Sequence, residues 1–171
     1  MPSLRTKTKT ENLAGWAYWI RHARSLRDDA FRDARIAKDR CQELYTAHKN
    51  RLAHHADVAK AADAVYGAER KVKVTESVYY DVKYTYLVID HLMNAAARVR
   101  RLLTTSEDFV SEKAWARGLA QCRQAMYGWW QDAEEGVAKA HELGMGKELG
   151  TGFTKAEIKE LLGISKQAKL F

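Results

Sequence analysis

Proline and cysteine are scarce in this chain of 171 residues, and no long apolar run is present. The only proline is Pro2, so no obligatory helix breaker follows it. Cys41 and Cys122 form no CxxC pair. We expect both to be small buried side chains of a protein in a reducing compartment. No apolar stretch approaches the ~20 residues of a membrane span. We therefore expect no membrane partner, and a location in the cytoplasm or within a virion or particle assembled there.

The sequence also lacks the motifs of common catalytic and metal sites. The glycine-rich segment 144–152 does not have the GxxxxGK[ST] order of a phosphate loop, and His141 with Glu142 does not form an HExxH motif. His48 and His55 are seven residues apart, which is too far for a compact tetrahedral site on one helix. We therefore expect no enzyme activity, no cofactor and no metal ion.

What the chain does contain is a long helical repeat. Hydrophobic residues make up 46% and charged residues 30%, as in a globular protein. A seven-residue apolar repeat begins at Leu13 and continues to Val65, which predicts one helix over 11–66 with coiled-coil-like packing. A break near His54–Asp57 is the main alternative to one continuous helix.

Two more repeats predict two more long helices. After an expected turn at Gly67, a second apolar repeat indicates a helix over 69–104, although its β-branched and aromatic residues would also suit strands. Ser111 is a good N-cap for a third helix, whose apolar stripe runs from Trp115 to Leu143. Thr154 and Glu157, not far beyond, have the spacing of a capping box.

These elements predict an all-α fold. We expect a long antiparallel helical hairpin plus a third long helix, forming an elongated coiled-coil-like bundle, and a short C-terminal helix. The corresponding division is a flexible basic arm at 1–10, the three-helix bundle at 11–143, a glycine-rich linker at 144–152, and the C-terminal helix and tail at 153–171.

Basic residues give the chain a net charge of +7, which suits a nucleic-acid or acidic partner without requiring one. A hairpin turning at Gly67 would bring Arg98 and Arg101 near Arg35 and Lys38, and such a patch could bind phosphates. Acidic residues are interleaved with the first pair, however, so an ordinary solvated helix face fits it as well.

Two tyrosines stand out on the second helix. Tyr80 and Tyr84 lie one turn apart, on the face away from the main apolar stripe. They could stack on nucleic-acid bases or pack against a helix of another protein or another copy of the chain. We favour the protein interface.

The C-terminal segment carries a more specific pattern. Its residues are Glu157 and Ile158, then Leu161 and Leu162, then Gly163, Ile164 and Ser165. Over residues 154–170 this pattern resembles the first helix, turn and start of the recognition helix in helix-turn-helix DNA-binding domains. The resemblance implies that Lys166, Gln167 and Lys169 face a groove or phosphates of DNA. Lys159 departs from the family, which has a small residue there, and a docking or capping helix is the alternative.

Taken together, these patterns predict a non-catalytic helical assembly or interaction protein. Its partner would be a second copy of the chain or another helical protein. Nucleic acid stays open as a further partner, in a regulatory or packaging role of the kind found in phages and mobile elements. The alternative is a purely structural coiled-coil subunit of a larger particle with no nucleic-acid contact.

Overall fold

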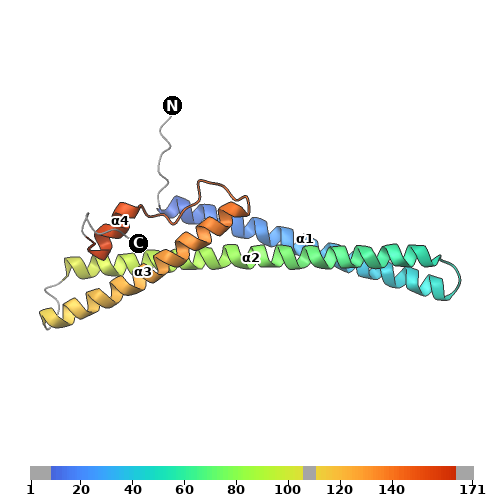
Figure 1. Ribbon diagram of the computed structural model, residues 1–171, viewed down its shortest axis with the longest axis horizontal. Helices are drawn as coiled ribbons and strands as arrows, with labels where there is room; N and C mark the ends of the chain where they lie inside the picture. Colours follow the sequence, from blue (N-terminus) through green and yellow to red (C-terminus); the bar gives the residue numbers. More distant parts are fainter. Residues whose placement is uncertain (1–8, 106–110, 165–171) are drawn as a thin grey trace, which may run out of the picture. The chain divides into compact units, whose positions relative to one another are not determined.

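The computed structural model describes residues 9–105 and 111–164 of the chain. Of these residues 86% are helical and none belongs to a strand. The helices are α1 (Lys9–Lys49), α2 (His55–Thr104), α3 (Glu112–Glu142) and α4 (Lys155–Leu162), labelled in Figure 1. The all-α prediction is confirmed, and the strand alternative for the second repeat is excluded. No helix in the described part of the chain has the length and apolar character of a membrane span.

The first reversal of the chain lies earlier than the sequence predicted. Helix α1 ends at Lys49 and α2 begins at His55, so the continuous helix over 11–66 and the turn at Gly67 are both wrong. The alternative of a break near His54–Asp57 lies close to the observed one. Arg51 adopts a left-handed conformation with φ of 59°, and the amide of Leu52 donates to the carbonyl of Ala47 at 2.8 Å. The amide of Arg51 donates to the carbonyl of His48 at 2.9 Å, which completes a Schellman motif. Arginine replaces the usual glycine of this motif, so the stop carries no clear sequence signal.

The position of this turn sets which residues of α1 and α2 face one another. Lys38 pairs with Glu69 at 2.8 Å, and Asp33 pairs with Lys71 at 3.3 Å. The residue numbers of these partners sum to 107 and 104, whereas a turn at Gly67 requires a sum near 135. Arg98 is 29 residues further along α2 than Glu69. The expected grouping of Arg98 and Arg101 with Arg35 and Lys38 is therefore wrong.

The contacts divide the chain into two compact units, which cut across the division expected from the sequence. We call residues 18–82 the hairpin unit; it contains most of α1 and the first part of α2. We call the described residues of the other unit, 9–17, 83–105 and 111–164, the core unit; it contains the start of α1, the rest of α2, and α3 and α4.

The interior of the hairpin unit consists mainly of alanine. Its buried side chains are Ala23, Ala30, Ala34, Ala61, Tyr79 and Val82. Tyr79 is the one large member, and the guanidinium group of Arg27 lies 4.2 Å from the centre of its ring. Small side chains at seven-residue spacing let the two helices approach closely, but they remove little apolar surface from water.

The core unit has a larger and more varied interior. Its fully buried large side chains are Trp16, Val88, Ile89, Leu92, Val99, Met126, Leu149 and Ile158. The second half of α2 runs antiparallel to α3, because the indole of Trp115 donates to the carbonyl of Leu102 at 2.8 Å and Gly136 lies against Thr85. Ser111 caps α3 as predicted, with its side chain accepting from the amide of Ala114.

The glycine-rich segment after α3 packs closely within the core unit and contributes three buried side chains, those of Met145, Leu149 and Thr151. The side chain of Asn12 donates to the carbonyl of Gly150 at 2.8 Å and accepts from its amide at 3.0 Å. The indole of Trp16 donates to the same carbonyl at 3.0 Å. A segment expected to be a linker is therefore held by the start of α1.

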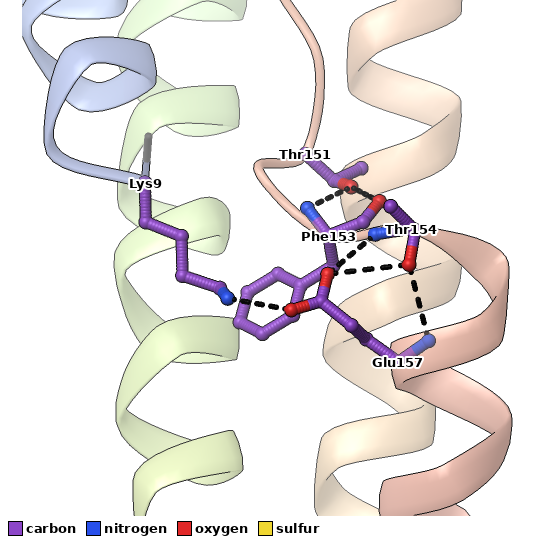
Figure 2. A network of polar contacts seen from close by, with 5 residues as sticks. All are labelled: Lys9, Thr151, Phe153, Thr154 and Glu157. Atoms are coloured by element: carbon purple, nitrogen blue, oxygen red, sulfur yellow. Dashed lines mark hydrogen bonds and ion pairs between the residues drawn. The ribbon is translucent and has the colours of Figure 1, made fainter. Parts of the chain in front are cut away.

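Helix α4 begins with the capping box that the sequence predicted. Thr154 accepts from the amide of Glu157 at 3.1 Å, and Glu157 accepts from the amide of Thr154 at 2.9 Å. The same carboxylate also forms an ion pair with the ammonium group of Lys9 at 2.9 Å. Figure 2 shows how these residues lie around the start of α4. The hydrogen bond from the Thr154 amide, followed by that from Lys9, lowers the pKa of Glu157. Gly163 ends the helix in the left-handed conformation, as predicted.

Candidate functional site

Large apolar side chains are exposed along both helices of the hairpin unit and, at Leu52, in the turn between them. They are Tyr18, Leu26, Phe31, Ile36, Tyr45, Leu52, Tyr66, Val74 and Tyr80. The exposed fraction reaches 70% for Tyr66 and 82% for Leu52. Scattered exposed apolar residues are ordinary on protein surfaces, but here the exposed side chains are larger than most of those that the hairpin unit buries. The hairpin unit therefore leaves more large apolar side chains exposed than it buries.

A shallow groove lies between the two helices of the hairpin unit, with a cavity volume of about 440 Å³. It is lined by Ala37, Arg40, Leu44, Asp57, Lys60, Ala61 and Ala64. Four of these residues are apolar and mostly small, and the three charged ones include both signs. We call this feature the hairpin groove. Its composition suits an apolar side chain from a partner, surrounded by polar contacts.

The two tyrosines predicted as an interface are both on the surface. Tyr80 is 54% exposed in the hairpin unit, where its ring meets the edge of Tyr79 at 5.3 Å between centres. Tyr84 is 58% exposed and belongs to the core unit. Their exposure fits either partner that the sequence left open.

The basic residues predicted on α1 lie among acidic residues. Lys38 pairs with Glu69 across the hairpin, and its hydrogen bond lowers the pKa of that carboxyl group. Neighbouring pairs join Arg27 to Asp28 and Arg32 to Asp29. Arg35 is exposed within this mixed surface. Because acidic partners neutralise much of the local charge, the structure favours the solvated-face interpretation of this part of α1.

The basic residues predicted on α2 have different surroundings. Arg98 and Arg101 line a half-open groove between α2 and α3 in the core unit, with a cavity volume of about 600 Å³. The lining residues are His91, Asn94, Ala95, Ala97, Arg98, Arg101, Cys122, Ala125 and Trp129. None of them is acidic. Within the described residues, the structure pairs neither guanidinium group with a carboxylate. We call this feature the basic groove.

Two stacked rings form one end of the basic groove. The imidazole of His91 lies nearly parallel to the indole of Trp129, with 4.8 Å between the ring centres and 23° between the planes. Next to them, the amide of Asn94 donates to the carboxylate of Asp90 at 3.4 Å, which is a long hydrogen bond. The basic groove therefore offers aromatic, amide and guanidinium groups along one face of α2.

Sequence reasoning identified Arg98 and Arg101 but missed His91 and Asn94. These four residues are spaced three, four and three apart, which places them on one helical face. The spacing is visible in the sequence as a polar stripe beside the apolar repeat. What the sequence could not show is that Trp129, on another helix, faces this stripe.

The helix-turn-helix residues are only partly described. Helix α4 covers the residues that the resemblance assigns to a first helix. It is in contact with α3, and its Ile158 and Leu161 side chains are buried. The guanidinium group of Arg123 also donates to the carbonyl of Leu161 at 2.8 Å. Lys166, Gln167 and Lys169 lie outside the described residues, and the resemblance to a helix-turn-helix segment stays a prediction.

The histidines near the first turn have structural partners. Nδ1 of His48 lies 2.9 Å from the carbonyl oxygen of Ala53, and its ring meets the edge of the His55 ring at 5.8 Å between centres. Across the residues that the structure describes, no three metal-ligating side chains come together. His48 therefore helps to hold the turn that ends α1.

Comparison of the chain with protein-family models, with curated proteins and with solved structures found no match. The two grooves and the exposed apolar residues are therefore the features of the chain that point to a function.

Proposed function

We propose that this chain is a non-catalytic assembly protein that associates with a second copy of itself through the hairpin unit. One observation carries the proposal: the hairpin unit buries mainly alanine while it exposes aromatic and branched side chains on both helices. Two helices with so small an interior gain little free energy from their own packing, because hydrophobic stabilisation grows with the apolar area removed from water. Association would bury the side chains that the fold itself leaves in solvent.

The hairpin unit contains both halves of a self-complementary contact. The apolar part of the lining of the hairpin groove is formed by Ala37, Leu44, Ala61 and Ala64. The exposed rings of Phe31 and Tyr66 are on the same two helices and are of a size to enter such a groove. Insertion of a side chain from one helix into a hole on another is the usual packing of coiled coils. A surface with both features can pair with a copy of itself.

The charge distribution supports a second copy over a strongly acidic or basic partner. Residues 18–82 contain 13 lysine or arginine and 10 aspartate or glutamate side chains, interleaved along both helices. Two such surfaces can meet with opposite charges in contact, because neither sign dominates. A partner of high net charge would instead gain from a surface of one sign.

The oligomeric state of the full chain tests the proposal. Sedimentation of the wild-type protein should show a dimer or larger species at micromolar concentration. Replacing Ala64 by tryptophan fills the hairpin groove and should weaken association by about tenfold or more, which corresponds to about 1.4 kcal/mol. The matched control is Ala59→Trp, an exposed position of α2 outside the groove, which should leave association unchanged.

Three results would count against the proposal. A compact monomer at high micromolar concentration excludes self-association. Equal effects of Ala64→Trp and Ala59→Trp, with the helical circular dichroism retained in both, exclude the hairpin groove as the contact. A monomer that forms a defined complex with a different helical protein from its source assigns the surface to that partner instead.

A further inference from the structure

We propose that the basic groove of the core unit binds single-stranded nucleic acid. In this assignment Arg98 and Arg101 hold phosphates, while the stacked pair of His91 and Trp129 provides the surface against which a base stacks. The proposal does not depend on the self-association described above, because it concerns other residues and another unit.

The electrostatics of the basic groove select an anion. Two guanidinium groups line it with no acidic side chain in the lining. On α1, by contrast, Lys38 and Arg32 each have a carboxylate partner. The nearest acidic residue on the lined face of α2 is Asp90, and its carboxylate accepts a hydrogen bond from Asn94. Guanidinium groups match phosphate geometry in a bidentate manner, so a phosphodiester is a better fit than a simple halide-sized ion.

The length of the basic groove along α2 favours a ligand with several linked phosphates over a single phosphate. Arg98 is seven residues from His91, which is about 10 Å along α2 at ~1.5 Å per residue. A ligand that reaches both the guanidinium groups and the rings must span this distance. A cavity of about 600 Å³ has the size of a small-ligand site. It can hold a short stretch of nucleotides but is too small to enclose a duplex.

The ring pair selects unpaired bases. Bases of a duplex stack on one another, so their faces are closed to a protein, whereas a single strand can place a base against an aromatic side chain. His91 is exposed and Trp129 is half-buried, and both line the groove. A basic groove with an aromatic surface is the usual arrangement for binding single strands without strong sequence preference.

The first test measures binding of a labelled 12-nucleotide thymidine strand to the full wild-type chain by fluorescence anisotropy at ~50 mM salt. We expect saturable binding that weakens steeply with salt, and weaker binding of a duplex of the same length. Absence of binding to the single strand overturns the proposal. Equal or tighter binding of the duplex also overturns it, and would favour a different nucleic-acid surface.

The second test locates the site with two charge-matched double variants. Arg98→Ala with Arg101→Ala should reduce affinity for the thymidine strand about tenfold or more, and should lower the log–log salt slope by about 0.7 for each phosphate that the variant no longer neutralises. Lys113→Ala with Arg117→Ala removes the same charge from exposed positions of α3 outside the groove. This control should keep most of the affinity and slope. Equal losses of affinity in the two variants mean that net charge alone drives binding, which overturns the assignment.

The third test examines stacking without changing the protein. A 12-nucleotide strand that lacks bases carries the same phosphates but has nothing to stack. We expect it to bind about fivefold or more weakly than the thymidine strand. Equal binding of the two strands, or displacement of both by millimolar inorganic phosphate, would show a generic anion site and overturn the single-strand assignment.

Discussion

The hairpin unit and the core unit are both built from long helices with seven-residue apolar repeats, yet their interiors differ. The hairpin unit buries four alanines, Tyr79 and Val82, whereas the core unit buries tryptophan, leucine, isoleucine and methionine from four helices. The periodicity of an apolar repeat therefore predicts a helix but does not predict how much surface the helix will bury. The size of the side chains at the repeat positions, and the number of helices around them, decide that.

This difference bears on how much each unit contributes to the stability of the fold. Full burial of a leucine-sized side chain contributes about 1.5–3 kcal/mol, and alanine contributes much less. The core unit buries many large apolar side chains, while the hairpin unit leaves most of its large apolar side chains exposed to solvent. The two units also differ in how their basic residues are arranged. Those of α1 in the hairpin unit lie among carboxylates, whereas Arg98 and Arg101 line a groove that has none in its lining.

The largest expected effect tests the contrast between the two interiors. Leu92 in the core unit is 0% exposed, so Leu92→Ala should lower the free energy of unfolding by about 2–5 kcal/mol, through reduced burial and a residual cavity. Ile36 in the hairpin unit is 60% exposed, so Ile36→Ala should change it by less than about 0.5 kcal/mol. Urea unfolding at the same low protein concentration measures both changes. Similar losses of stability in the two variants would remove the contrast.

A second comparison between the two units concerns the space around a glycine inside a helix of each. A Cβ atom at Gly136 in the core unit would lie 2.5 Å from the Thr85 hydroxyl oxygen, whereas one at Gly67 in the hairpin unit would meet nothing within 4 Å. Gly136→Ala should therefore destabilise the protein by about 1–3 kcal/mol through overpacking. Gly67→Ala should stabilise it by about 0.5–1 kcal/mol, because alanine is the better helix former.

Thermal unfolding of both glycine variants measures these changes, with Gly128→Ala as a control within α3. A Cβ atom at Gly128 also meets nothing within 4 Å, so this variant should behave like Gly67→Ala. A stabilising Gly136→Ala would mean that α2 and α3 are not closely packed at Thr85.

The smallest expected effect concerns how the free energy of unfolding changes at acidic pH, through Glu157 in the core unit. The pKa of Glu157 in the folded protein lies below its ordinary value of 4.5. Its ionised form therefore stabilises the fold above pH 4.5, and this contribution is lost as the pH falls through the lower, folded-state pKa. Glu157→Gln keeps a side chain that can form the capping box but removes the ion pair with Lys9. It should lower stability at pH 7 by less than about 1 kcal/mol.

Urea unfolding at pH 7 and at pH 3 checks this prediction. The difference between wild type and Glu157→Gln should shrink at the lower pH. Glu160→Gln, at an exposed position of the same helix, serves as the control for removal of one negative charge. A difference that persists unchanged at pH 3 would contradict an ionic role for Glu157.

The sequence predicted the helices well and their connections less well. Ser111, Thr154, Glu157 and Gly163 each mark a helix end by local hydrogen bonding or backbone conformation, and all four do so in the structure. The end of α1 was missed because Arg51 takes the left-handed position that glycine usually fills. Gly67 was misinterpreted as a turn because a glycine inside a long helix costs only ~1 kcal/mol, which packing and helix formation on both sides can offset.

By itself, the sequence determined that the chain forms long amphipathic helices without an interior proline to break them, and where three of their ends lie. Local propensity and capping depend on residues within a few positions of one another, so a single sequence is enough to reveal them. Only the tertiary structure decided which residues meet: Lys38 with Glu69, Asn12 with Gly150, and His91 with Trp129. Those contacts join distant positions, and a turn placed 15 residues from where the sequence predicted it changes every pairing that follows.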